Sequence, residues 1–228
     1  MRKMPFVLAA LLAVVGICVM LWPVFTGHRL QANTDAAVQE FLTERDKPEQ
    51  QYPELLAALQ EYNRQLYVEK QSGLVDLEAC ETPAVDLNAY GIEDEIIGVL
   101  EITAMELTMP VYLGASDVHL AAGAAVLGNT SAPIGDDNSN CVIAGHRGWR
   151  GADYFRYIDR LQVGDTVTLT NLWETLTYIV ADIQIMQPHE VEKIKIQPNR
   201  DLLTLITCHP YASGGKQRYV VYCEREMP

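Results

Sequence analysis

The stretch TLITCHPYASGGKQRYVVY, residues 204–222, joins two runs rich in β-branched and aromatic residues. Such runs are typical of β-strands, and the pair Gly214-Gly215 between them is typical of a turn that returns the chain antiparallel. The first run ends on Cys208, and the second opens on Arg218. We therefore expect these two side chains to lie close together at one end of a strand pair.

Similar short runs continue upstream and predict a β-rich domain. Because a series of short strands separated by turns is typical of barrels, we expect a closed or nearly closed, antiparallel-rich β-barrel. Short helical pieces are expected near residues 117–124 and 154–161. The β-type runs begin at Ile96, so we place the start of the domain near residue 92. The runs are IIGVLEI (96–102), MPVYL (109–113), CVIAGH (141–146), DTVTLT (165–170), TLTYIVADIQI (175–185), LLTLITC (202–208) and RYVVYC (218–223).

The amino terminus carries an apolar run over residues 5–25 that no charge interrupts. Its length suits a membrane-spanning helix, and the two basic residues before it predict a cytoplasmic start with the rest of the chain outside. A cleaved signal peptide is the alternative, but HRLQANTD (28–35) is a poor cleavage site. We expect residues 1–27 to form a single-pass membrane anchor.

Composition excludes some classes of partner and site. The chain has 17 Lys and Arg against 30 Asp and Glu, and 15 basic residues remain when the two before the anchor are set aside. An acidic surface repels phosphate polymers, so nucleic acid is not an expected partner. The five cysteines form no CxxC pair or regular spacing, so neither a zinc site nor a disulfide scaffold is indicated.

Residues 28–91 are expected to hold helices followed by a long loop. The second helical stretch has one apolar stripe at helical spacing, made of Leu55, Leu59, Tyr62 and Leu66. Periodicity fails from residue 71 to 91, and a loop of that length is either functional or mobile. Our hypothesis is that residues 74–90 cover part of a cleft, with a mobile linker as the alternative. We do not expect a disulfide between Cys80 in this loop and Cys208.

A cysteine at the end of a strand becomes a nucleophile only when suitable partners lie near it, and a lone one is more often a core residue. His209 is adjacent to Cys208, but neighbouring strand residues point to opposite faces unless Pro210 ends the strand first. His146 closes the run CVIAGH before a turn, where it is well placed to project over a neighbouring strand's end. We therefore favour His146 as the partner imidazole.

Acyl transfer by a thiol and an imidazole also needs a group, such as a fixed cation, that stabilises the developing oxyanion. An imidazole can lower the pKa of a thiol and return a proton to the leaving group, and a guanidinium can stabilise the oxyanion of acyl transfer. Arg218 is the favoured candidate because the glycine turn brings it back towards Cys208. Arg147 and Arg150 are alternatives that spacing alone does not eliminate.

Five segments together resemble the sortases, the membrane-anchored cysteine transpeptidases of Gram-positive bacteria. The resemblance covers residues 97–225 and implies a closed eight-stranded sortase-type β-barrel with short helices at residues 92–228. The last two segments match the family's Thr-Leu-x-Thr-Cys signature and its arginine-bearing final strand. In chain order, the segments are LEITAMELTMPVYLGAS (100–116), CVIAGHRGW (141–149), YFRYIDRLQVGDTVTLTN (154–171), LLTLITCHPY (202–211) and QRYVVY (217–222).

The resemblance implies that Cys208 attacks the Thr–Gly carbonyl of an LPxTG-type sorting signal and forms a thioacyl intermediate. His146 would protonate the departing amine, Arg218 would hold the carbonyl and its oxyanion, and Thr207 would help to shape the pocket. An amine of a pilin lysine or of a peptidoglycan precursor would then resolve the thioester. No metal or other cofactor is needed for any step, although some family members bind calcium in a loop.

The segments TCHPY and GHRGW and the expected amino-terminal helices resemble the pilus-building branch, class C. Two features depart from that branch: residues 73–91 hold no Asp-Pro lid motif, and the sequence holds no second apolar span after the last strand. A housekeeping sortase that attaches proteins to a peptidoglycan precursor is therefore the first alternative. A membrane-tethered binding module whose cysteine is structural is the second.

Two further thiols are expected in the barrel interior. Cys141 lies five residues before His146, and Cys223 lies five after Arg218, so each should face away from the reactive side. The family's topology places the cysteine strand between theirs, at roughly twice the 4.8 Å strand spacing. That separation exceeds disulfide reach, and we predict no bond between them.

Overall fold

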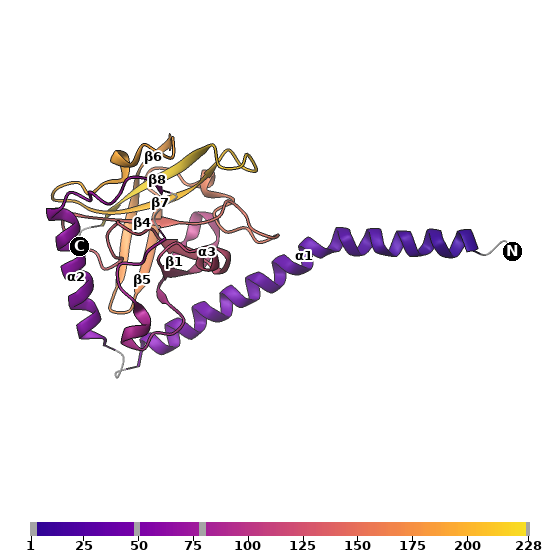
Figure 1. The fold of residues 1–228 in the computed structure, drawn as a ribbon, viewed down its shortest axis with the longest axis horizontal. Coiled ribbons are helices and arrows are strands. Elements are labelled where there is room, and N and C mark those ends of the chain that lie inside the picture. The colour runs from indigo at the N-terminus through magenta and orange to yellow at the C-terminus, as the bar shows by residue number, and fades with distance from the viewer. Residues whose placement is uncertain (1–3, 48–50, 78–80, 227–228) are drawn as a thin grey trace.

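The computed structural model describes residues 4–47, 51–77 and 81–226, in which eight strands close into a barrel (Figure 1). Around the barrel the strand order is β1-β2-β3-β4-β7-β8-β6-β5. The pairs β2–β3 and β4–β7 are parallel and the other six are antiparallel, which confirms the predicted architecture. The strands are β1 (Ile96–Ile102), β2 (Leu107–Leu113), β3 (Ala124–Val126), β4 (Ser139–Ala144), β5 (Thr166–Asn171), β6 (Thr175–Met186), β7 (Asp201–His209) and β8 (Gln217–Arg225).

Seven strands fall on the predicted runs, and β3 is the strand that the sequence pattern missed. It has three residues, too few to show a period of two, and its first residue, Ala124, lay in the segment expected to be helical. The helix α3 (Asp117–Ala122) does form, with the Ser116 hydroxyl accepting from the His119 amide at its start. Pairing with β2 and β4, rather than local preference, makes Ala124–Val126 a strand.

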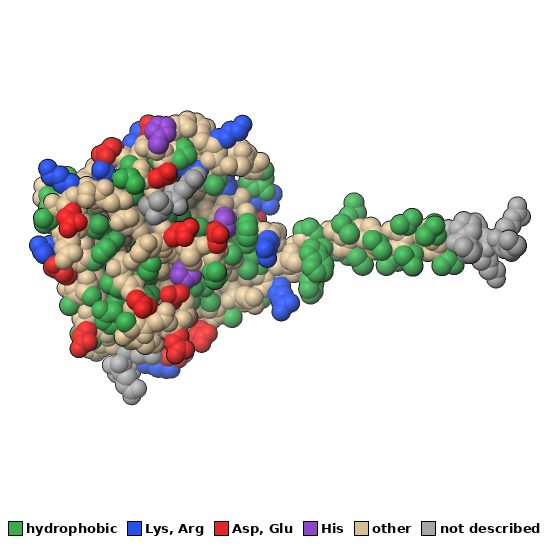
Figure 2. All heavy atoms as spheres, in the orientation of Figure 1, with side chains coloured by type: hydrophobic (Ala, Val, Ile, Leu, Met, Phe, Trp, Pro, Cys, Tyr) green, Lys and Arg blue, Asp and Glu red, His purple; other side chains and the backbone are tan. Residues whose placement is uncertain are grey.

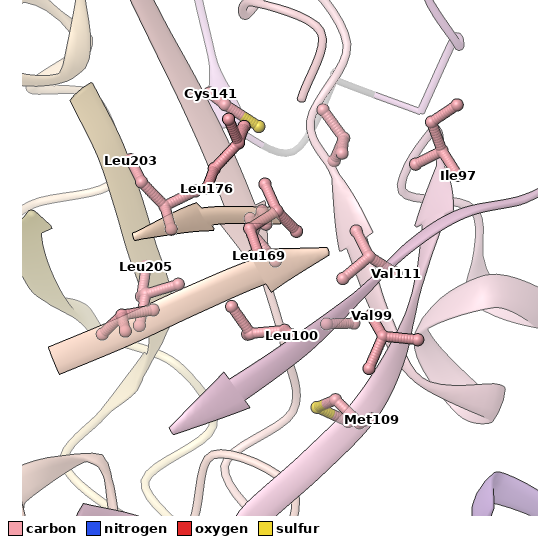
Figure 3. Packing of buried hydrophobic residues seen from close by; sticks show 14 of the residues in the cluster. Ile97, Val99, Leu100, Met109, Val111, Cys141, Leu169, Leu176, Leu203 and Leu205 are labelled. Carbon is pink, nitrogen blue, oxygen red and sulfur yellow. The ribbon is translucent and has the colours of Figure 1, made fainter. Parts of the chain in front are cut away.

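Apolar side chains from all sides fill the barrel interior, where Leu100, Leu169 and Leu203 are fully buried (Figure 3). Strand β7 is buried on both faces. Its Leu203 and Leu205 belong to the interior cluster, whereas Ile206 belongs to a second cluster on the outer face. That outer cluster includes Leu74 and residues of η5 (Val191–Ile194), so the cover over β7 comes from the loops that cross it.

The helix α2 (Pro53–Val68) buries one stripe against the barrel, as its periodicity predicted. The buried positions are Leu55, Leu59, Asn63 and Leu66, so Asn63 takes the place expected for Tyr62, which is only partly buried. One polar atom of the buried Asn63 is satisfied, since its Oδ1 accepts a hydrogen bond from the Ala132 amide at 2.7 Å. After α2, the short helix η2 (Leu87–Tyr90) precedes β1.

The helix α1 (Met4–Arg45) continues from the apolar segment into the part that packs on β1 and β2. Two helical stretches were expected after the apolar segment of residues 5–25, but the first of them is continuous with that segment in one helix. The apolar half projects away from the barrel with exposed hydrophobic side chains, and it is long and apolar enough to cross a membrane (Figures 1 and 2). In the other half, Val38 and Phe41 are buried against the barrel.

Candidate active site

Cys208 and Arg218 face each other across the antiparallel pair β7–β8, where their residues are direct register partners. Cys208 is exposed. Gly215 lies close to both side chains, because a Cβ added there would be 3.1 Å from the Cys208 Sγ and 3.3 Å from the Arg218 Nη1. The glycine turn therefore brings the thiol and the guanidinium together, as the sequence predicted.

Backbone carbonyls hold the Arg218 guanidinium. Its Nη1 donates to the Gly215 carbonyl at 2.5 Å and to the Gln217 carbonyl at 3.2 Å. The two alternative arginines are engaged elsewhere: Arg147 bonds His209 and Asp159, and the guanidinium of Arg150 lies over the Trp149 ring. Arg218 is thus the one of the three candidate cations that the structure places beside the thiol.

His146 lies two residues beyond the end of β4, so it begins the turn rather than closing the strand as predicted. The Trp149 ring stacks on its imidazole, with centroids 4.3 Å apart and an interplanar angle of 15°. The Phe155 amide donates to the His146 carbonyl at 3.0 Å. Burial lowers the pKa of His146, an effect that the negative charge of Asp117 opposes.

One pocket of about 170 Å³ brings the sequence-predicted residues together. His146, Thr207, Cys208 and Arg218 all line it. The remaining wall is mostly apolar. Leu77, Leu120 and Leu127 come from segments distant in sequence from Cys208, and Ile206 comes from β7 itself. This arrangement places a thiol, an imidazole and a guanidinium beside an apolar surface, and these are groups that nucleophilic acyl transfer can use.

Thr207 is buried, and its hydroxyl donates to the Gly145 carbonyl at 2.6 Å. This bond joins the end of β7 to the residue before His146. The parallel pairing of β4 with β7, in which Ala144 opposes Ile206, sets up the contact.

His209, the histidine next to Cys208 in sequence, contacts Arg147. β7 continues through His209 before Pro210, so the strand alternation that excluded it applies. His209 Nδ1 lies 2.8 Å from the Arg147 Nη1.

Sequence reasoning did not single out several residues of the site, among them Gly215, Leu77 and Trp149. Gly215 stood in the quoted turn, where its φ of 76° suits glycine, but no local signal places it against the thiol. Leu77 lies in the loop that we expected to cover a cleft, and its position in the pocket wall supports that hypothesis. Trp149 stood in a quoted motif, and only the fold shows that it stacks on His146.

Cys141 and Cys223 are free, buried thiols. Leu203 of β7 pairs with both, so the cysteine strand lies between theirs as the family topology implied. Burial raises the pKa of both thiols, that of Cys223 to about 12. Cys80, considered above as a partner of Cys208, lies outside the described residues.

The described ranges hold no group of three or more His, Cys, Asp or Glu side chains that could bind a metal ion.

The sequence of residues 100–226 matches the model of the sortase domain, which is more than half of the chain. The protein therefore belongs to the sortase family, as the motifs predicted. It is 28% identical over 130 residues to sortase D of Bacillus subtilis and 29% identical over 136 residues to sortase A of Streptococcus agalactiae. These matches cover 56% and 58% of this chain, and 63% and 53% of the relatives, so the chain spans less than two thirds of either.

Solved structures similar to this chain include several sortases C. Sortase C of Clostridium perfringens SM101 has a TM-score of 0.69 at 27% identity, with 85% of this chain and 99% of that one covered. Sortase C of Streptococcus pneumoniae has a TM-score of 0.68 at 29% identity, with 85% and 97% covered. The resemblance to class C therefore extends from the motifs to the fold.

Proposed function

We propose that this protein is a membrane-anchored cysteine transpeptidase that cleaves an LPxTG-type sorting signal between Thr and Gly. The observation that carries the proposal is the exposed thiol of Cys208, which shares one pocket with His146 and Arg218. Membership of the sortase family supports the reaction class, and the apolar wall supports binding of an apolar Leu-Pro segment.

In the proposed reaction, the Cys208 sulfur attacks the Thr carbonyl carbon, and Arg218 stabilises the negative charge that develops on the carbonyl oxygen. His146 gives a proton to the leaving glycine amine, which departs as the C–N bond breaks and leaves a thioester on Cys208. Thr207 shapes the pocket floor beside the nucleophile. An acceptor amine then attacks the thioester, forms a new amide and releases the thiol.

A pilin lysine is the proposed acceptor amine. One similar structure is described as a pilus-related sortase C of Group B Streptococcus, and another is described with reference to pilin substrate specificity. A housekeeping role, with a peptidoglycan precursor as acceptor, is the alternative. The two differ in the amine offered to the same thioester.

The proposed division of the chain has three parts. Residues 1–27 form the cytoplasmic start and the membrane anchor, residues 28–91 form the helices and the loop beside the cleft, and residues 92–228 form the catalytic barrel outside the membrane. The exposed apolar half of α1 supports the anchor, and the basic residues before it support a cytoplasmic amino terminus.

Incubation of the full chain in detergent with LPxTG-containing peptides, with and without a pilin-type lysine peptide, tests the proposal. We expect cleavage after Thr and transfer to the added amine, and Cys208→Ala should lower both rates by at least about 10³-fold because Cys208 is the one thiol among the described residues that line the pocket. Peptide products are measured by mass spectrometry.

Cys18→Ala is the matched control, because Cys18 is an exposed thiol in α1 remote from the pocket. It should leave both rates unchanged. Cleavage that survives Cys208→Ala, in a protein with an unchanged melting temperature, would contradict the assigned mechanism.

A further inference from the structure

The residues that directly follow the three proposed catalytic residues form one cluster of their own. Arg147 follows His146, His209 follows Cys208, and Tyr219 follows Arg218. The guanidinium carbon of Arg147 lies 5.3 Å from the centre of the Tyr219 ring, and the His209 and Tyr219 ring centroids are 5.8 Å apart. Strand alternation explains part of this arrangement, because the residue after a pocket-facing one points to the opposite face.

Arg147 is the centre of this cluster. Its Nη1 lies 2.8 Å from the His209 Nδ1, and its Nη2 donates to the Asp159 Oδ2 at 3.0 Å. A guanidinium only donates hydrogen bonds, so in this contact the Arg147 Nη1 donates and the His209 Nδ1 accepts. The bond therefore has a defined direction, from Arg147 to His209.

Arg147 is buried to an unusual degree for an arginine. Its side chain is 6% exposed, whereas that of its partner Asp159 is 56% exposed. Its Nε is also buried without a hydrogen-bond partner in the described part of the chain. An unpaired buried donor lowers stability, so this burial of the guanidinium is maintained at a cost.

The bond from Arg147 to His209 is one of two that flank the catalytic pair. Thr207 donates to the Gly145 carbonyl on one side, and Arg147 donates to His209 on the other. Residues 145 and 147 enclose His146, and residues 207 and 209 enclose Cys208. Each of the two chain segments is thus tied to the other both before and after its reactive residue.

We infer that Arg147 is a positioning residue, which fixes the segment of His146 against the end of β7 through its hydrogen bond to His209. This inference rests on the proposed function. The bond sets the distance between the imidazole and the thiol, and it makes no contact with the apolar wall that would bind the peptide. A displacement of about 1 Å in reacting groups can cost up to about 100-fold in rate, so its loss should lower kcat more than it changes KM.

Two substitutions of His209 test whether the hydrogen bond from Arg147 matters, or only the presence of a polar side chain at position 209. His209→Asn keeps an acceptor, Oδ1, at the place of Nδ1, whereas His209→Gln moves its acceptor one bond further out. With an LPxTG peptide, we expect His209→Asn to retain kcat within about twofold. His209→Gln and Arg147→Ala should lower kcat about tenfold or more, with KM within about twofold of the parent value.

Arg156→Ala is the matched control, because Arg156 lies in the same segment and pairs with Asp153 and Tyr211 but not with His209. It should leave kcat unchanged. Thermal melting by circular dichroism checks that each variant is folded, and the two His209 variants keep the test valid if Arg147→Ala does not fold. Equal kcat in the Asn and Gln variants, or a rise in KM with constant kcat, would overturn the inference.

The rate at which iodoacetamide alkylates Cys208 at neutral pH tests the position of the His146 imidazole relative to the thiol, and it needs no peptide substrate. We expect His209→Gln to slow it severalfold and His209→Asn to leave it unchanged, because the neighbouring imidazole promotes thiolate formation. If no peptide is cleaved but this difference persists, the proposed substrate is wrong and the positioning role stands. If peptides are cleaved and neither kcat nor alkylation separates the variants, the positioning role is wrong and the proposed function stands.

Discussion

Cys208 and the two core thiols carry the same chemical group on neighbouring strands, yet their surroundings differ in every respect that governs reactivity. Cys208 is exposed beside the Arg218 guanidinium. Cys141 and Cys223 are buried on the two sides of Leu203, and Figure 3 shows Cys141 among interior leucines. A thiol reacts as its thiolate, which a cation and solvent favour and an apolar interior disfavours.

The difference arises from position along one strand. Leu203 and Cys208 are five residues apart on β7, an odd number, so they face opposite sides of the sheet. The outer face is covered as far as Ile206, which packs under Leu74 and η5, and the cover stops at Cys208. The site therefore forms at Cys208, where loops no longer cover the outer face of β7.

Alkylation under native conditions tests the difference in reactivity between Cys208 and the two core thiols, and it has the largest expected effect. In a Cys18→Ser, Cys80→Ser background, we expect iodoacetamide to modify Cys208 at least about a thousandfold faster than Cys141 or Cys223, since the core thiols react only after the barrel opens. Peptide mapping after timed quenching measures the three rates. Comparable rates for Cys208 and Cys223 would show that the two environments do not differ as described.

Gly215→Ala tests whether the close approach of the Arg218 guanidinium to the Cys208 thiol supports activity. The added methyl would lie 3.1 Å from the Cys208 Sγ and 3.3 Å from the Arg218 Nη1, so we expect it to separate them and lower peptide cleavage about tenfold. Initial rates of cleavage measure the effect.

Gly214→Ala is the control for backbone strain. Gly214 has a φ of 74°, almost the same as the 76° of Gly215, but an added Cβ there meets nothing within 4 Å. If the two variants lose activity equally, strain in the turn rather than contact with the thiol and guanidinium explains the loss.

Leu77→Ala tests the cover at the edge of the site, and its expected effect is the smallest. Leu77 lines the pocket and belongs to the outer cluster, so truncation should open access to Cys208 and raise its alkylation rate two- to threefold. Val75→Ala is the control, because Val75 is exposed in the same loop. An unchanged rate in Leu77→Ala would remove this part of the loop from any covering role.

Local sequence patterns predicted the features of the fold that depend on residues close together in the chain. Seven strands, the helix α2 and the approach of Cys208 to Arg218 followed from alternation, helical spacing and a glycine turn. Position after a strand favoured His146 as the partner imidazole, and the family resemblance supported it. Its convergence with Cys208 depends on parallel pairing between β4 and β7, whose paired residues Ser139 and Asp201 are 62 positions apart.

Long-range contacts account for what the sequence did not predict. β3 is a strand because two neighbours pair with it, and Asn63 is buried because the Ala132 amide meets it. The bond between Arg147 and His209 joins residues 62 positions apart, and no local period reports such a pair. Sequence spacing therefore left Arg147 open as a competing cation, and only the fold gave it separate partners.

The thioacyl adduct on Cys208 is the most direct test of the central claim that three side chains at this barrel end make the thiol an acyl acceptor. The full chain is mixed with an LPxTG peptide, quenched in acid and analysed by intact-mass and peptide-mapping mass spectrometry. We expect the mass of the peptide up to Thr to appear on Cys208 and to disappear when an amine is added. No adduct on Cys208 while the peptide is being cleaved, or an adduct on another residue, would contradict the account.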